Sequence, residues 1–144
     1  MAKGIVAPDE SVILAINSRG IPHAPSGAEM PFVVKALLPF GSLTVSIDRD
    51  SREIIDSFHQ YQPTIEKKNK STVSKESFLN PEFENFPAVI HSGVDCMNHP
   101  VHIGEDFLVL HNPAAVSPIP NRLFPWARQL RYENDGLIEL PREV

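Results

Sequence analysis

The chain has 144 residues, a formal net charge of −5 at neutral pH and an apolar content of 42%. This length predicts one domain spanning residues 1–144, and the negative charge argues against a general binder of nucleic acid or of anionic membranes. No apolar stretch approaches the ~20 residues of a membrane span, and the start, MAKGIVAPDE, lacks the long apolar core of a secretory signal. A single cysteine cannot form an internal disulfide, so we expect a cytoplasmic protein.

The first third of the chain predicts two helices. Residues 9–20, DESVILAINSRG, have acids at the start, an arginine near the end and a terminal glycine, which is typical of a short helix. The apolar run VILAI is nearly continuous, so a buried strand is the alternative. After a proline-rich connection, Ser26 is expected to cap a second helix that ends at Pro39 and Gly41.

A strand and a third helix are expected next. Residues 43–48 alternate between aliphatic and polar side chains, which predicts a half-buried strand. Residues 50–61 predict a helix capped by Asp50 or Ser51, because Ile54, Ile55 and Phe58 fall on one stripe at helical spacing. Residues 62–78 contain few apolar side chains and several lysines, which predicts a flexible loop.

The second half of the chain combines apolar runs with turn signals. Residues 88–91 (AVIH) and 107–111 (FLVLH) predict two buried strands, each of which ends at a histidine followed by turn residues. Residues 123–132 predict a helix, and an NDG turn precedes a last strand, LIEL. Interspersed helices and strands favour an α/β or α+β fold with a small mixed sheet of about four to five strands and helices packed on it.

Four of the six histidines and the only cysteine lie between Ala88 and Pro113. If the two strands run parallel, His91 and His111 meet at the carboxyl edge of the sheet, where open α/β sheets place their ligands. If they run antiparallel, the two imidazoles lie at opposite ends and form no joint site. The sequence leaves both arrangements open.

A histidine-centred hydrolase is the first functional hypothesis. His111 would act as general base and His91 as general acid, since imidazoles titrate near neutral pH. Alternatively, Cys96 would act as a nucleophile activated by a nearby histidine, although a lone cysteine beside a turn is more often inert. The expected substrate is a phosphorylated or nucleotide-like small molecule. The supporting groups are Asp95 and Asn112, which could orient a ring, and Arg122, Arg128 and Arg131, which could grip an anion.

Two other hypotheses remain open beside the hydrolase. No lysine or arginine occurs from Glu76 through Asn121, which suits a divalent metal such as zinc, or a cationic group, better than a phosphate. The candidate ligands are His99 and His102, together with His91, Asp95, Cys96 and His111.

Finally, the chain could be a non-catalytic protein- or ligand-binding module whose contact surface is the proline- and aromatic-rich segment around Trp126, with homodimerisation as one arrangement.

Overall fold

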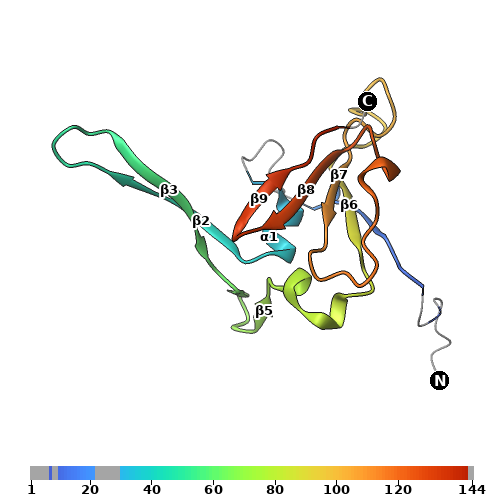
Figure 1. Cartoon of the computed structure of the whole chain (residues 1–144), viewed down its shortest axis with the longest axis horizontal. Helices are drawn as coiled ribbons and strands as arrows, with labels where there is room; N and C mark the ends of the chain where they lie inside the picture. Colours follow the sequence, from blue (N-terminus) through green and yellow to red (C-terminus); the bar gives the residue numbers. More distant parts are fainter. Residues whose placement is uncertain (1–6, 8–9, 22–29, 143–144) are drawn as a thin grey trace.

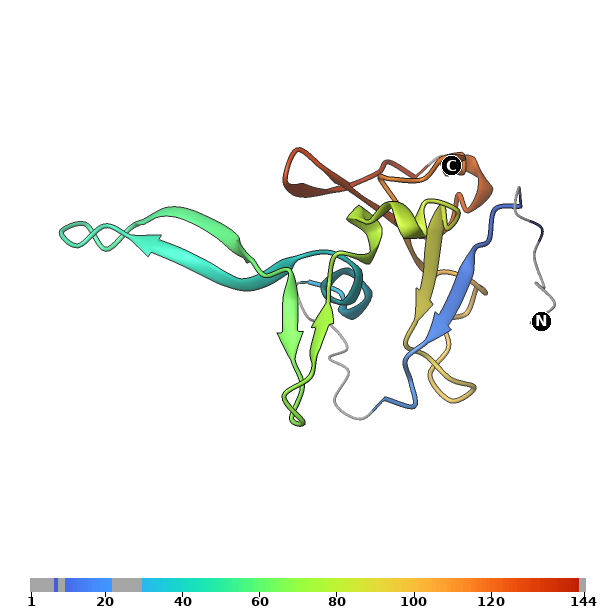
Figure 2. The ribbon, with the colours of Figure 1, turned by 90° about the horizontal axis from the view of Figure 1, so that it is seen from below.

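The computed structural model of the chain describes residues 7, 10–21 and 30–142. Strands account for 36% of the described residues and helical turns for 12%. A five-stranded sheet forms the body of the protein, and two hairpins project from it (Figures 1 and 2). The predicted α/β or α+β class, with helices packed on a sheet, is therefore wrong because most of the expected helices are strands or short turns.

The body of the protein is a mixed sheet with the strand order β1-β6-β7-β8-β9. Its strands are β1 (Leu14–Asn17), β6 (Ala88–Ser92), β7 (Leu108–His111), β8 (Arg128–Glu133) and β9 (Gly136–Glu139). The pairs β1/β6 and β7/β8 are parallel, whereas β6/β7 and β8/β9 are antiparallel. The turn between β8 and β9 has positive φ angles at Asn134 and Asp135, as a two-residue type I′ hairpin turn requires.

Each face of the sheet is covered differently. Helix α1 (Phe32–Leu37) and Leu38 pack on one face against Val89, Leu110 and Leu130, and this is the larger apolar core. The apolar cluster on the opposite face is smaller and is centred on Val109. Its remaining members come from β6 and from the segments that flank β7 and precede β8, namely Ala88, Ile90, Phe107, Ile119, Phe124 and Ala127.

Two hairpins occupy the region between α1 and β6. The longer hairpin pairs β2 (Phe40–Ile47) with β3 (Ile54–Tyr61), and the shorter one pairs β4 (Thr64–Glu66) with β5 (Thr72–Ser74). Three single-turn 3₁₀ helices complete the described elements: η1 (Ser77–Leu79), η2 (Pro81–Phe83) and η3 (Asn121–Leu123). The residues predicted as a lysine-rich loop thus contain β4, β5 and η1.

Three predicted helices are replaced by strands. Residues 9–20 contain β1, which is the strand alternative of the prediction, and residues 50–61 contain a turn followed by β3. Residues 123–132 contain the end of η3 and most of β8. β1 and β8 join the central sheet, where burial of a pleated face outweighs local propensity, whereas β3 pairs with the adjacent β2 in a largely exposed hairpin.

The second predicted helix forms, but it is short. It begins at Phe32, directly after Pro31, and ends at Leu37. The proposed cap, Ser26, lies outside the described residues. Among the residues that the structure describes, no helix combines the length and the apolar character of a membrane span.

Candidate functional site

The antiparallel pairing of β6 and β7 separates the two histidines of the predicted catalytic pair. His91 pairs with Leu108 at one end of the two strands, and His111 pairs with Ala88 at the other end. His91 and Ala88 are three positions apart on one strand, so the two histidines also lie on opposite faces of the sheet. A joint acid–base site of His91 and His111 is therefore excluded by the strand direction.

Each of these histidines has its own hydrogen-bond partner. The Nε2 atom of His111 lies 2.8 Å from Oε1 of the buried Gln129, and the Nε2 atom of His91 lies 2.9 Å from Oγ of Ser18. Burial lowers the pKa of the His91 imidazole. Burial also lowers the pKa of His111, reinforced by the nearby positive charge of Arg131 and partly opposed by the hydrogen bond to Gln129.

Asn112 is a structural residue. Its side-chain nitrogen donates to the carbonyls of Phe83 and Phe86, each at 2.9 Å, and its side-chain oxygen accepts from the backbone N–H of Ala114 at 2.9 Å. The side chain is buried and uses both ends to join η2 to the chain after β7. It is therefore not available to orient a histidine ring.

The three predicted anion-binding arginines do not converge. Arg128 and Arg131 lie on a strand and not on a helix, so a spacing of three residues places them on opposite faces. The Nε atom of Arg128 lies 2.9 Å from a carboxylate oxygen of Glu139, and Nη2 of Arg131 lies 3.4 Å from the side-chain oxygen of Asn121. Arg122 is exposed on η3.

Trp126 has a structural role as well as an exposed edge. Its ring packs edge-to-face against Phe107 and Phe124, with centroids 5.5 and 5.8 Å away. The indole also covers Gly104, whose φ angle is +97°. The proline- and aromatic-rich segment thus covers one face of the sheet, and 41% of Trp126 remains exposed.

The predicted metal ligands do not form a metal site. His99 and His102 are exposed, and the Nδ1 atom of His99 lies 2.8 Å from the carbonyl oxygen of Pro100. Within the described part of the chain, no group of three or more His, Cys, Asp or Glu side chains is arranged to hold a metal ion. The described residues therefore do not support the predicted zinc or other divalent metal site.

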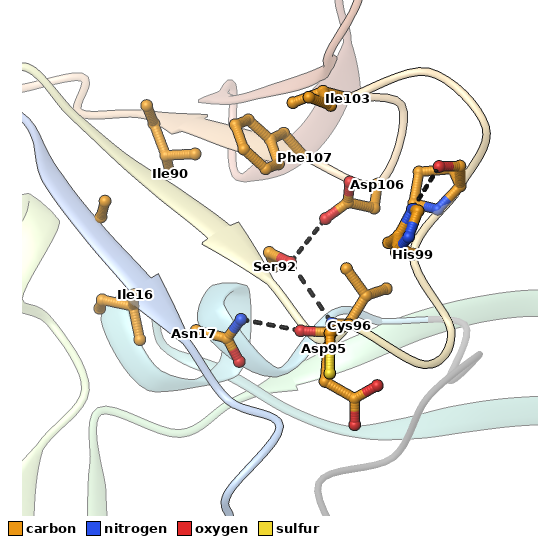
Figure 3. A pocket seen from close by; sticks show the side chains of 13 residues that line it. Ile16, Asn17, Ile90, Ser92, Asp95, Cys96, His99, Ile103, Asp106 and Phe107 are labelled. Carbon is orange, nitrogen blue, oxygen red and sulfur yellow. Dashed lines mark hydrogen bonds between the residues drawn. The ribbon is translucent and has the colours of Figure 1, made fainter.

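A groove of about 570 Å³ lies beside the carboxyl ends of β1 and β6 (Figure 3). Residues 93–107, here called the β6–β7 loop, form its outer wall. Most of the exposed lining is apolar. The apolar lining residues are Ala15, Ile16, Ile90, Val94, Pro100, Ile103 and Phe107, and the others are Asn17, Ser92, Asp95, Cys96, His99 and Asp106.

The register of β1 and β6 explains which side chains reach the groove. Ala15 pairs with Ile90, and Asn17 pairs with Ser92, so these four side chains share one face of the sheet. His91 lies between Ile90 and Ser92 on β6 and therefore points to the other face. Of the predicted site residues, the structure brings Asp95, Cys96 and His99 to the groove and excludes His91 and His111.

Hydrogen bonds tie the β6–β7 loop to the sheet. The side-chain nitrogen of Asn17 donates to the carbonyl of Val94 at 2.9 Å, and its oxygen accepts from the backbone N–H of Arg19 at 2.8 Å. Asp95 accepts from the guanidinium of Arg19 at 2.5 Å and from the backbone N–H of Met97 at 2.9 Å. These hydrogen bonds lower the pKa of the Asp95 carboxyl, with Arg19 as the largest cause.

Asp106 is the carboxylate that faces into the groove. One of its oxygens accepts a hydrogen bond from Oγ of Ser92 at 2.5 Å (Figure 3). Among the described residues, no other side-chain or backbone donor contacts this carboxylate, whereas both oxygens of Asp95 are occupied. No lysine or arginine side chain belongs to the lining. The groove therefore combines apolar walls with one accessible negative charge.

Sequence reasoning identified three of the thirteen residues that line the groove. The residues from β1, together with Ser92, Asp106 and Phe107, were not identified as site residues. The available signals were the strand alternative for VILAI and the absence of lysine and arginine from residue 76 to residue 121. Position in the sequence does not show that β1 lies beside β6, because the pairing joins residues 75 positions apart, as in Leu14 and Val89.

Comparison with known proteins gives no relative. No family model matches the sequence, no curated protein is detectably similar to it, and no solved structure shares its fold at a significant level. Functional conclusions therefore rest on the geometry of the chain.

Proposed function

We propose that the protein is a non-catalytic binding module for a small molecule with an apolar body and one amine or ammonium group. The observation that carries this proposal is the groove of about 570 Å³, with apolar walls and the Asp106 carboxylate facing into it. Its volume lies in the range of small-molecule sites, which are concave, mostly apolar and fitted with a few polar groups.

The charge of the ligand follows from the donors and acceptors in the groove. Asp106 is an acceptor when ionised, and no lysine or arginine lines the groove to bind a phosphate or a carboxylate. A ligand ammonium would replace solvent at the free oxygen of Asp106 and form a charge-assisted hydrogen bond. The apolar body would contact Ile90 and Phe107. This arrangement favours an alkyl or arylalkyl amine over the phosphorylated substrate of the hydrolase hypothesis.

The binding module is favoured over the hydrolase because the histidine pair does not form. His111 lies at the far end of β7, away from the groove, and its Nε2 atom is engaged by Gln129. Cys96 and His99 line the groove, but the structure shows no hydrogen bond between them. A histidine activates a cysteine nucleophile through that contact, so the geometry does not support nucleophilic catalysis by Cys96.

A fragment titration tests the proposal. Calorimetry or NMR shift mapping would compare phenylalkylamines with phenylalkyl alcohols of equal length. We expect the amines to bind more tightly, by about tenfold, because one charge-assisted hydrogen bond contributes about 1.5 kcal/mol. Asp106→Asn should remove this preference for the amine while retaining the apolar contribution.

Glu105→Gln provides the matched control, since it removes the same formal charge from an exposed neighbour outside the groove lining. It should leave the preference unchanged. Bound amine should also slow the alkylation of Cys96, which is exposed and lines the groove. Equal affinities for amine and alcohol, or equal effects of the two variants, would contradict the proposal.

A further inference from the structure

The β2–β3 hairpin, here called the arm, extends well beyond the body of the protein (Figures 1 and 2). Every residue of β3 except His59 is exposed. An isolated two-stranded hairpin is only marginally stable in water, and long apolar strands at an edge invite pairing. The arm is nevertheless rich in exposed isoleucine, which indicates a contact surface and not a solvated loop.

The apolar side chains of the arm gather on one face. Leu43 pairs with His59, Val45 with Ser57, and Ile47 with Ile54, so Leu43, Val45, Ile47 and Ile54 share that face and are here called the aliphatic strip. Their exposed fractions are 45, 40, 60 and 68%. Ile55 is the extra residue of the bulge beside Ile54 and is 67% exposed.

The opposite face of the arm is different in character. Thr44 pairs with Phe58, and Ser46 pairs with Asp56, the only charged residue of the two strands. The charged side chains of the tip lie in the turn between Ile47 and Ile54. The aliphatic strip therefore carries no formal charge along its length and requires an apolar surface as its partner.

The root of the arm is fixed by several contacts. The ring of Phe40 packs edge-to-face on His59 and Tyr132, with centroids 5.8 and 5.7 Å away. The Nζ atom of the buried Lys75 donates to the carbonyl of Phe40, and the backbone N–H of Gln62 donates to the carbonyl of Pro39 at 2.7 Å. The arm is thus held in a defined direction, which lowers the entropic cost of docking.

The tip of the arm is also ordered. The carboxylate of Asp48 accepts hydrogen bonds from the backbone N–H groups of Asp50 and Ser51, at 2.9 and 2.8 Å. The backbone N–H of Asp48 donates to the carbonyl of Glu53 at 2.9 Å. Order at both ends keeps the aliphatic strip extended and exposed in the isolated chain.

We propose that the aliphatic strip packs against the same strip of a second copy of this chain, so that two arms form a two-fold symmetric dimer. An uncharged strip of aliphatic residues is its own complement, as an isologous interface requires. Two arms packed face to face would form the sheet-on-sheet contact that buries one apolar side of each.

The available area fits a reversible dimer. The strip and Ile55 expose on the order of 400 Å² of apolar side chain per copy, which is on the order of 800 Å² for two copies. Because apolar atoms make up roughly 60% of an interface, the whole contact would bury about 1,300 Å², at the lower end of specific interfaces. We therefore expect dissociation in the micromolar range.

Sedimentation of the full chain at increasing concentration tests the proposal. The average mass should rise from one chain toward two between about 1 and 300 µM, as expected for a micromolar dimer. Ile47→Glu and Ile54→Glu, tested separately, should each weaken association at least tenfold, because each would bury an unpaired charge in an apolar contact. Both positions are more than half exposed, so the folded chain should be retained.

Ser46→Glu is the matched control, since it introduces the same charge on the opposite face of the arm. It should associate like the unmodified chain. The tryptophan emission and the melting temperature of all three variants verify that the body is folded. A chain that stays monomeric at the highest concentration would overturn the proposal, as would equal effects of Ser46→Glu and Ile47→Glu.

Discussion

His111 donates a hydrogen bond from Nε2 to the Oε1 atom of Gln129 across 2.8 Å. The direction follows from Gln129, whose side-chain nitrogen donates to the carbonyls of Asn121 and Phe124 at 2.8 and 2.9 Å. The oxygen of this amide is therefore the end that faces His111, and it can only accept. The buried imidazole is held as an orienting donor between β7 and β8, which gives it a structural role.

The buried His111 and the partly buried His91 predict that stability falls in mild acid. Burial lowers the pKa of His111 and His91, so their folded pKa values lie below the ordinary value of 6.5. The unfolded chain then binds more protons as the pH falls. Their stabilisation is complete above about pH 6.5 and is lost as the pH falls through the folded pKa values. Urea unfolding between about pH 7.5 and 5.5 measures the effect, with these pH limits chosen to span about one unit on either side of that value.

His111→Gln separates this effect from general acid sensitivity. The glutamine side chain can still donate to Gln129 but does not titrate in this range. We expect a shallower decline in the free energy of unfolding below pH 6.5 than in the unmodified chain. His102→Gln, at an exposed position, should retain the full decline. Identical pH profiles for all three proteins would contradict the assignment.

Asn112→Asp should destabilise the fold by about 3 kcal/mol, because a carboxylate oxygen would replace the nitrogen that donates to Phe83 and Phe86. Two buried carbonyls would then face a buried negative charge. Chemical denaturation measures the change. Asn98→Asp is a suitable comparison, since Asn98 is exposed and its side-chain oxygen, which accepts from the backbone N–H of Asp95, is retained. If Asn112→Asp lowers the free energy of unfolding by less than about 1 kcal/mol, the contact between η2 and the chain after β7 relaxes around the new carboxylate.

Gly104→Ala should disturb the groove and the only tryptophan together. A Cβ atom at Gly104 would lie 2.6 Å from two carbons of the Trp126 ring, and the φ angle of +97° is unfavourable for alanine. We expect the free energy of unfolding to fall by about 2–4 kcal/mol and the tryptophan emission to shift. Gly20→Ala has open space around it and should change neither quantity. Unchanged emission in Gly104→Ala would show that the indole does not rest on this glycine.

Gly41→Ala should loosen the root of the arm. A Cβ atom there would lie 2.8 Å from the carbonyl oxygen of Gln60 on the paired strand. The two strands must separate to accommodate it, so amide hydrogens along β2 and β3 should exchange at least tenfold faster. A Cβ atom at Gly136 would lie 3.6 Å from its nearest neighbour, the carbonyl oxygen of Glu133. Gly136→Ala should therefore leave the exchange rates of the arm unchanged.

Short apolar runs bounded by turn residues, together with one alternating run, were the reliable strand signals in the sequence. The strands expected at AVIH, FLVLH and LIEL correspond to β6, β7 and β9, and the alternating run from residue 43 corresponds to the middle of β2. The helices failed where Ile54, Ile55 and Phe58 matched a helical stripe by coincidence. In the structure these residues lie on β3, and the register with β2 decides which of them share a face.

The antiparallel direction of β6 and β7 prevents the predicted histidine site from forming. Of the histidine-rich stretch, Asp95, Cys96 and His99 line the groove, whereas His91 and His111, on which the predicted site was centred, do not. The pairing of β6 with β7 was the missing information, because it separates His91 from His111. No local pattern encodes whether two strands joined by a long loop run parallel or antiparallel.

The parallel pairing of β1 with β6 also determines when the groove can form during synthesis. Leu14 leaves the ribosome 75 residues before its partner Val89, a delay of about 4–15 s at ordinary elongation rates. During that interval β1 has no strand beside it, and the wall formed by Ala15 and Asn17 does not exist. Occupancy of the groove would therefore distinguish a fully folded nascent chain from one in which only the arm and α1 have emerged.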